Sequence, residues 1–190
     1  MKIIFLAGTL GQGGAEKQLY LLSADLKKHG HEVLIYSLTK GEYWEEKIKT
    51  KNIPVEYIGS SPNRLKRLIL LIKKLKKEKP DIVYGFHFYT GIYAGIAGRL
   101  AGVFSIGSIR NNGFVERDQN GLMSYFHFQL PHAIIANSKH GLLTAQKIFV
   151  LKRKRTAILH NGLEFTNWKI KDPFKLNDPL RILFVRTIKK

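Results

Sequence analysis

The first forty residues constrain the fold of this chain more than any other segment. An apolar run over residues 3–7 leads into a glycine-rich turn, a helical pattern begins at Ala15, and a second apolar run covers residues 33–38. The turn contains Gly8, Gly11, Gly13 and Gly14. A strand, a glycine-rich turn, a helix and a second strand direct backbone N–H groups and a helix N-terminus towards a phosphate. The segment therefore predicts a Rossmann-like unit with an anionic ligand at its turn.

The pattern of short apolar runs alternating with helices continues along the chain. Further strands are predicted at residues 55–58, 81–85, 104–109, 133–137 and 156–159. Helices are predicted at residues 91–102 and 120–130, with a polar loop over 110–118, and Ser138 is predicted to cap a helix that ends near residue 149. Short strands that alternate with helices indicate a doubly wound, mainly parallel α/β sheet. We expect about seven strands with helices on both faces.

The alternation stops after residue 164. Residues 1–164 are predicted to form the Rossmann-like domain, residues 165–179 read as a polar, proline-containing linker, and residues 180–190 begin with a fresh apolar strand. A strand that starts a new unit at this point is interpreted as the first strand of a truncated second domain.

Charge and composition limit the partners. The net charge is +18, from 32 Lys and Arg residues against 14 Asp and Glu residues. Such an excess predicts an anionic partner, which could be a nucleic acid, a membrane surface or a phosphorylated small molecule. The chain has no cysteine, which excludes disulfides and thiolate metal sites. No apolar stretch approaches the roughly 20 residues that a membrane-spanning helix needs, and no signal-peptide pattern is present, so we expect a cytoplasmic protein.

The glycine-rich turn fits two familiar phosphate sites poorly. Glu16 occupies the place of the third glycine of a dinucleotide fingerprint, and the second strand ends in Ser-Leu-Thr-Lys without the acidic residue that would hold a ribose. A P-loop is excluded because Gly13 is not followed by Lys-Ser or Lys-Thr. The motif therefore disfavours both a nicotinamide or flavin dinucleotide and an NTPase site.

Four ordered motifs resemble a family of sugar-transferring enzymes. They are Gly-Gly-Ala-Glu at 13–16 with His-Gly-His-Glu-Val at 29–33, Pro-Asp-Ile-Val at 80–83 running into Phe-His-Phe-Tyr at 86–89, Ala-Asn-Ser at 136–138, and His-Asn-Gly-Leu-Glu at 160–164. Together they make residues 2–165 similar to the amino-terminal half of the retaining GT-B glycosyltransferases of the family-four, or group-one, type.

The resemblance implies a two-domain hexosyltransferase of polysaccharide biosynthesis. Its amino-terminal half would hold a glycan or polyprenyl-linked acceptor, and the other half would bind a nucleotide-sugar donor as co-substrate, with no other cofactor and no metal. Transfer would retain the anomeric configuration. Because the donor-binding half is missing, we expect this chain alone to be inactive. The alternative is a non-catalytic, anion- or membrane-binding Rossmann-like fragment.

The resemblance also implies roles for particular residues. Gly13 and Gly14 would face the donor diphosphate, since a residue without Cβ lets a phosphate approach the backbone. His87, at the carboxyl end of a strand, would lie at the acceptor hydroxyl as a proton acceptor or an orienting hydrogen-bond partner. The alternatives are a tight strand-to-helix turn for the glycines and a packing role among aromatic neighbours for His87.

Two further pairs follow strand ends and could contact the acceptor or the donor. Arg110 and Asn111 come directly after the strand at 104–109, where a guanidinium suits a phosphate or sugar hydroxyls, although a loop cap or surface ion pair is an equal alternative. Asn161 and Gly162 lie at the expected mouth of the interdomain cleft, or form a simple Asn-Gly turn. The histidines show no metal-ligand spacing.

A strongly basic helix is predicted over residues 64–79 and is expected to end before Pro80. Its apolar stripe is predicted to comprise Leu65, Leu68, Ile69, Ile72 and Leu75. The patch able to meet anionic headgroups comprises Lys66, Arg67, Lys73, Lys74, Lys76 and Lys77. A solvated basic face is the simplest alternative, but we favour peripheral association with the inner face of the membrane. Nucleic acid is disfavoured because the aromatic clusters, at 84–89 and 125–128, lie apart from the basic residues.

Overall fold

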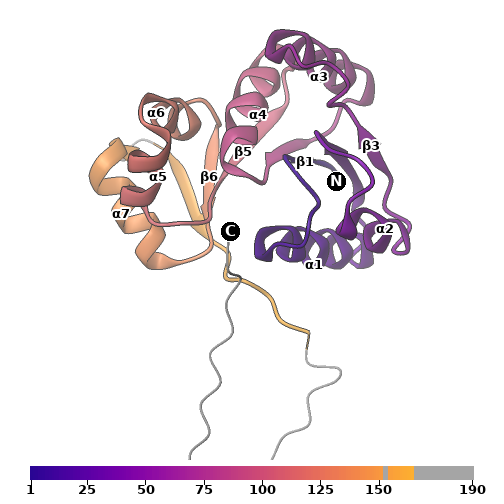
Figure 1. Ribbon diagram of the computed structural model, residues 1–190, viewed down its shortest axis with the longest axis horizontal. Coiled ribbons are helices and arrows are strands. Elements are labelled where there is room, and N and C mark those ends of the chain that lie inside the picture. The colour runs from indigo at the N-terminus through magenta and orange to yellow at the C-terminus, as the bar shows by residue number, and fades with distance from the viewer. Residues whose placement is uncertain (152–153, 165–190) are drawn as a thin grey trace, which may run out of the picture.

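The computed structural model describes residues 1–151 and 154–164 and contains one parallel sheet (Figure 1). The strands run in the order β3-β2-β1-β4-β5-β6-β7, and every neighbouring pair is parallel. This confirms the predicted doubly wound α/β fold. The predicted linker at 165–179 and strand at 180–190 lie outside the described residues. The strands are β1 (Lys2–Ala7), β2 (Glu32–Ser37), β3 (Val55–Tyr57), β4 (Ile82–Gly85), β5 (Phe104–Ile109), β6 (Ala133–Ala136) and β7 (Arg155–Ile158).

Helices cover both faces of this sheet. The helices of the β1-to-β3 half lie on one face and the later helices on the other, as the rule of right-handed crossovers predicts for a chain that reverses direction along the sheet after β3. Figure 1 shows α1 and α2 on one side and α3 and α4 on the opposite side, with α5 to α7 beyond β6. The helices are α1 (Gly14–Lys28), α2 (Tyr43–Lys49), α3 (Arg64–Glu78), α4 (Phe88–Ala101), α5 (Gly113–Asn120), α6 (Leu122–Gln129) and α7 (Lys139–Phe149).

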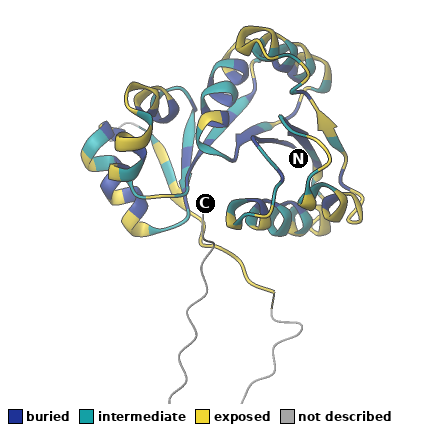
Figure 2. Cartoon of the chain, in the orientation of Figure 1, coloured by how far each residue is buried: buried dark blue, intermediate teal, exposed yellow. Residues whose placement is uncertain are grey.

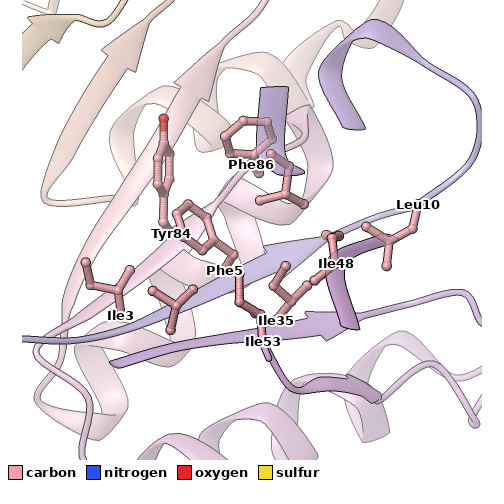
Figure 3. Close-up of a cluster of buried hydrophobic side chains, with 11 residues drawn as sticks. Ile3, Phe5, Leu10, Ile35, Ile48, Ile53, Tyr84 and Phe86 are labelled. Atoms are coloured by element: carbon pink, nitrogen blue, oxygen red, sulfur yellow. The ribbon is translucent and has the colours of Figure 1, made fainter. Parts of the chain in front are cut away.

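The central strands β1 and β4 form the best-buried part of the core. Phe5 on β1 packs against Tyr84 and Phe86 with ring centroids 5.4 Å and 6.0 Å apart, and Figure 3 shows this aromatic group beside the isoleucines of β1 and β2. Leu6 lies opposite Gly85 in the register of the two strands. The carboxyl ends of β1 and β4 therefore lie side by side, at the edge where α/β sheets place their ligands.

Two predicted helix boundaries are wrong, and capping explains both. Helix α4 begins at Phe88 rather than at residue 91, because Thr90 Oγ1 accepts a hydrogen bond from the His87 N–H at 3.0 Å. The predicted loop at 110–118 and helix at 120–130 are instead two helices. Asn112 Oδ1 caps α5 by accepting from the Val115 N–H at 2.9 Å, and Gly121, with φ of 52°, separates α5 from α6. The predicted cap of α7 is confirmed, since Ser138 Oγ accepts from the Gly141 N–H.

The predicted apolar stripe of the basic helix α3 is wrong in part. Leu71 and Leu75 are fully buried, whereas Leu65 and Ile69 are 63% and 45% exposed. The buried face of the helix is centred on Leu71 and Leu75, with Leu68 and Ile72 partly buried beside them, because this face packs on the core cluster of β1 and β4. Leu65 and Ile69 therefore remain on the outer surface of α3, where Figure 2 draws exposed residues in yellow.

Candidate active site

A hydrogen bond between the backbone of the glycine-rich turn and a histidine marks the centre of the candidate site. Gly8 follows the end of β1, and His87 follows the end of β4. The Gly8 N–H donates a hydrogen bond to His87 Nδ1 at 3.0 Å. A backbone N–H can only donate, so Nδ1 carries no proton and the neutral ring holds its proton on Nε2. His87 is half-buried, and both of its nitrogens are engaged within the chain.

The second nitrogen of His87 faces an acid on the first turn of α1. His87 Nε2 lies 3.0 Å from Oε1 of Glu16, whose residue is 7% exposed. Burial acts to raise the pKa of the Glu16 carboxyl, but the hydrogen bond from His87 and one from its own backbone N–H outweigh burial and lower the pKa below its usual value. Glu16 is thus an ionised acceptor at neutral pH. The sequence pattern identifies it only as the residue that breaks the dinucleotide fingerprint.

The Glu16 side chain also explains why Gly13, one of the two glycines predicted to bind phosphate, lacks a Cβ. A Cβ on Gly13, the residue that precedes α1, would lie 2.0 Å from Glu16 Oε2, so the carboxylate lies over Gly13. A Cβ on Gly14, the first residue of α1, would meet no atom of the described residues within 4 Å, and Gly14 has no positive φ. Nothing in the described part of the chain therefore requires glycine at Gly14.

The glycine-rich turn is held from the other side by Glu42, the residue before α2. Its carboxylate accepts hydrogen bonds from the Thr9 hydroxyl at 2.9 Å, from the Leu10 N–H and from the Thr39 hydroxyl. Burial acts to raise the pKa of Glu42, but these hydrogen bonds lower it. Glu42 lies some thirty residues from the turn, and only the folded arrangement of β1 and β2 reveals this contact.

Arg110 provides a positive charge beside the histidine. Its guanidinium carbon lies 3.8 Å from the centroid of the Phe86 ring, and its Nε is buried without a hydrogen-bond partner. No acid in the described ranges forms an ion pair with Arg110. Burial lowers the pKa of Arg110, an effect that the nearby Tyr84 opposes. A desolvated cation of this kind is suited to bind an anion or several sugar hydroxyls.

A small pocket of about 270 Å³ lies between α4 and α5 and is lined by His87, Arg110, Asn111 and Glu116, among others. Glu116, on α5, is 4% exposed, and burial raises its pKa although hydrogen bonds from Asn111 oppose the rise. Asn120 Nδ2 donates to Glu116 Oε2 at 3.3 Å. Glu116 is not among the site residues predicted from the sequence, because the stretch around it reads as a polar loop.

A larger cleft of about 530 Å³ lies on the other side of Arg110 and Phe86, between α1 and the segment after β7. That segment is tied to α1 by two hydrogen bonds. The Gly162 N–H donates to Gln18 Oε1 at 2.7 Å, and Gln18 Nε2 donates to the Gly162 carbonyl at 3.0 Å. Asn161 lines the same cleft and is exposed.

Comparison with known proteins connects this geometry to a family. The family description Glycosyltransferase Family 4 matches residues 12–166. The chain belongs to glycosyltransferase family 4. This agrees with the resemblance that the four sequence motifs indicated, and no curated protein sequence matches the chain significantly.

Solved structures show the same fold in GT-B glycosyltransferases. HepE of Anabaena, in complex with UDP-glucose, is 20% identical with a TM-score of 0.69 over 87% of this chain and 45% of HepE. The lipopolysaccharide outer core galactosyltransferase WaaB is 16% identical with a TM-score of 0.60, over 88% of this chain and 47% of WaaB. MurG of Acinetobacter baumannii is 17% identical with a TM-score of 0.56, over 74% of this chain and 42% of MurG. This family 4 chain therefore spans less than half the length of these proteins and has the Rossmann-like fold of a GT-B amino-terminal domain.

The fold of this family 4 chain gathers most of the predicted site residues at one edge of the sheet. His87, Arg110 and Asn111 line the smaller pocket, and Arg110 also lines the cleft that contains Asn161 and Gly162. The predicted membrane-contacting residues lie apart from this edge, on α3. Four of them are exposed, Lys74 forms an ion pair with Glu56, and Arg67 is half-buried. The exposed four are Lys66, Lys73, Lys76 and Lys77.

Two structural findings bear on metals and membranes. Within residues 1–151 and 154–164, no group of three or more metal-ligating side chains could hold a metal ion. No helix in those ranges combines the length and the apolar character that are needed to cross a bilayer.

Proposed function

We propose that this chain is the acceptor-binding half of a retaining glycosyltransferase that transfers a hexose from a nucleotide-sugar to a lipid-linked surface-glycan acceptor. The observation that carries the proposal is the hydrogen-bonded series Gly8–His87–Glu16. It joins the glycine-rich turn, the end of β4 and the first turn of α1 beside the smaller pocket, which His87 lines.

On the donor side, the diphosphate would approach the glycine-rich turn and the N-terminus of α1. The first turn of a fifteen-residue helix presents backbone N–H groups and a positive dipole end, and Gly14 leaves the backbone open there. Arg110, without an acid partner in the described residues, adds a positive charge at the same edge. HepE, which shares this fold, has been crystallised with UDP and with UDP-glucose, and this supports a nucleotide-sugar as the donor.

For His87 we favour the orienting role over the proton-accepting role. The nitrogen that carries no proton, Nδ1, is occupied by the Gly8 N–H, and Nε2 presents a proton to Glu16. An acceptor hydroxyl that replaced Glu16 at Nε2 would therefore meet a donor, not a base. The His87–Glu16 pair then positions the acceptor and the turn relative to each other.

In the transfer itself, the bond between the anomeric carbon and the leaving diphosphate breaks, the bond to the acceptor oxygen forms, and the proton of that oxygen passes to the departing diphosphate. The chain's own residues would orient the acceptor and stabilise the negative charge that develops on the diphosphate, which is the task that a fixed guanidinium performs. We assign no covalent step to any described residue.

The exposed lysines of α3 support peripheral association with an anionic membrane. Lys66, Lys73, Lys76 and Lys77 lie on one helix, and each basic residue near an anionic surface contributes about 1 kcal/mol. A lipid-linked acceptor would be reached from such a surface. The membrane-binding fragment without catalysis remains the alternative function.

The proposal is tested by joining the chain to the nucleotide-sugar-binding half of a family 4 enzyme. Transfer of radiolabelled sugar from UDP- and GDP-sugars to a membrane lipid extract is measured for the chimera, for His87→Ala and for His140→Ala, a control at an exposed position on α7. We expect transfer that falls about a hundredfold in His87→Ala, the scale of a misplaced acceptor, and that is unchanged in His140→Ala.

The same variants separate the two functions. A folded chimera that transfers no sugar, while the chain alone binds phosphatidylglycerol vesicles, would favour the membrane-binding fragment. Replacing the four exposed lysines of α3 by glutamine should abolish vesicle binding at low salt if the basic helix is the contact.

A further inference from the structure

Helix α4 lacks the polar outer face that a helix on the surface of a sheet normally has. Its sequence from Phe88 to Ala101 contains one charged residue, Arg99. Gly91, Ala94 and Gly98 are buried, with Gly91 facing the His127 ring of α6 and Gly98 facing Ser105 of β5. The outer face carries apolar residues as well, and a helix that is apolar all round is normally covered by something.

That outer face forms the floor of an apolar groove with a volume of about 660 Å³, which we call the α4 groove. Figure 1 shows α4 between α3 and the α5–α6 pair, and the groove extends from the first turn of α3 to the start of α6. Leu65 and Met123, at its two sides, are 63% and 47% exposed. The groove is lined mainly by Leu65, Leu68, Ile92, Tyr93, Ile96 and Met123.

The charged residues at the groove are all basic. Arg64 and Arg67, from the first turn of α3, line it, and no acidic residue does within the described part of the chain. Arg67 Nε is buried without a hydrogen-bond partner, and its guanidinium lies 6.0 Å from the centroid of the Tyr93 ring. A buried N–H donor of a cation without a partner is costly unless a ligand supplies an acceptor. An apolar floor with such a cation at its edge is complementary to a hydrocarbon chain that carries an anionic group.

The α4 groove is continuous with the candidate active site. Phe88, Tyr89 and Asn120 line both the groove and the pocket that contains His87. The Tyr89 ring also lies over Gly8, since a Cβ on Gly8 would be 2.0 Å from the Tyr89 hydroxyl. A molecule lying in the groove can therefore extend its polar end past Tyr89 to the histidine.

We propose that the α4 groove binds the hydrocarbon chain of an isoprenyl phosphate acceptor, and that Arg67 binds its phosphate. This inference rests on the proposed function, in which the acceptor is lipid-linked, and it adds the surface that recognises the lipid part. The groove volume is that of a small-molecule site, so it holds the segment of one chain nearest the phosphate.

The test measures binding to the 190-residue chain directly, without sugar transfer. Isoleucine methyl groups are isotope-labelled and followed by NMR during titration with farnesyl monophosphate, farnesol and inorganic phosphate, each below any micelle-forming concentration. The methyl signals of Ile92 and Ile96 report on the groove. The signal of Ile48, which is fully buried in the core cluster that contains Phe5, is the internal control. We expect farnesyl monophosphate to shift the two groove signals saturably, farnesol to bind about tenfold more weakly, and inorganic phosphate to leave them in place.

Two matched pairs of variants locate the two parts of the ligand. Ile96→Asp should weaken farnesyl monophosphate binding about tenfold, while Leu100→Asp, at a 59% exposed position on the same helix, should not change it. Arg67→Gln should reduce the affinity for farnesyl monophosphate to that for farnesol, while Lys139→Gln on α7 should keep the difference. Both mutated groove residues are partly exposed, and the dispersion of the methyl spectrum confirms that each variant is folded.

Three results would overturn the inference. The first is the absence of saturable shifts of the groove methyl signals. The second is an Ile92 shift in Ile96→Asp equal to that in the unmutated chain. The third is binding of dihexanoyl phosphatidylglycerol in the groove as tight as that of farnesyl monophosphate, which would make the occupant a bulk lipid. If the chimera described above still transfers sugar after any of these results, the proposed function stands and only the assignment of the groove fails.

Discussion

The Nε2 atom of His87 and the Oε1 atom of Glu16 lie 3.0 Å apart although the residues are 71 positions apart in the sequence. The pair joins the N-cap of α4 to the first turn of α1, and the Gly8 N–H fixes which nitrogen of the ring carries the proton. Because the imidazole is engaged at both nitrogens, its orientation is set by the chain before any ligand arrives. Such prior orientation is what a site for a sugar hydroxyl requires.

We predict that Glu16 and His87 are energetically coupled. Glu16→Gln keeps an acceptor for His87 Nε2 but loses the charge, so it should cost less stability than Glu16→Ala, which leaves the buried donor unsatisfied and should cost about 1–3 kcal/mol. Urea unfolding of the single variants, of His87→Ala and of the double variant measures the coupling. A coupling energy of about 1 kcal/mol is expected, and strictly additive effects would show that the two side chains do not interact.

The buried acids Glu16 and Glu116 should respond to pH in opposite directions. The folded-state pKa of Glu16 is lowered from 4.5, so its contribution to stability is present above pH 4.5 and is lost as the pH falls through the folded-state pKa. The folded-state pKa of Glu116 is raised from 4.5, so its contribution is present below pH 4.5 and is lost as the pH rises through the folded-state pKa.

Comparison of Glu16→Gln and Glu116→Gln with the unmutated chain tests these signs. As the pH rises from about 4 to about 7, the free energy of unfolding of Glu116→Gln, measured with urea, should increase relative to that of the unmutated chain. For Glu16→Gln, measurements extended to about pH 3 should show a deficit that is nearly constant above pH 4.5 and shrinks as the pH falls below it. Parallel curves for both variants would refute the assigned directions.

The parallel sheet was predictable from the sequence, while the contacts that build the site were not. Short apolar runs separated by helices specify a parallel sheet, and Ser138 identifies the start of α7 because a hydroxyl is a strong cap. The position of His87 after a strand also followed from the pattern. Its partner did not, since Glu16 belongs to another motif and no spacing rule links residues that meet only through the pairing of β1 with β4.

The remaining errors arise where tertiary contacts outweigh local pattern. The stretch after β5 reads as polar loop, yet Asn112 caps a helix there that packs against α7 and buries Glu116. On α3, spacing alone selected a stripe that contains Leu65, and the structure buries Leu71 instead. That difference leaves Leu65 free to line the α4 groove, which periodicity alone would have assigned to the core.

His127 should make the domain sensitive to mild acid. This residue of α6 is fully buried, its ring stacks on Phe88 with centroids 4.3 Å apart, and its Nε2–H donates to the Ser108 carbonyl at 2.8 Å. Burial lowers the pKa of His127 from 6.5 to about 4. As the pH falls, His127 therefore takes up a proton at a higher pH in the unfolded chain than in the folded chain. Stability, measured by urea unfolding, should fall as the pH drops from 6.5 towards 4. His127→Gln, which keeps a donor for Ser108, should reduce this loss, and His140→Gln should not.

Gln18 should control the order of the segment that closes the larger cleft. Its side chain makes both hydrogen bonds to Gly162, and the contact is exposed. Gln18→Ala should therefore change global stability by less than about 1 kcal/mol while removing protection from the Gly162 amide. Amide hydrogen exchange at Gly162 measures the effect, with Gln129→Ala on α6 as a control that removes a side-chain hydrogen bond elsewhere. Unchanged exchange at Gly162 in Gln18→Ala would mean that other contacts hold the segment.

Three glycines of the turn should differ in what an added methyl group does. At Gly8 the new Cβ would meet the hydroxyl and ring of Tyr89 at 2.0 Å and 2.4 Å, so Gly8→Ala should displace Tyr89 and lower stability by about 1–3 kcal/mol. At Gly13 it would meet the end of the Glu16 side chain, which can move, so Gly13→Ala should reproduce the loss of the His87–Glu16 coupling at a smaller cost.

At Gly14 the new Cβ would meet no atom of the described residues within 4 Å. Gly14→Ala should therefore leave stability equal or higher, by up to about 1 kcal/mol, because alanine favours helix. If the donor diphosphate lies against this backbone as we propose, Gly14→Ala should nonetheless reduce sugar transfer by the chimera. Thermal unfolding together with transfer separates the three cases, and full transfer in Gly14→Ala would place the diphosphate elsewhere.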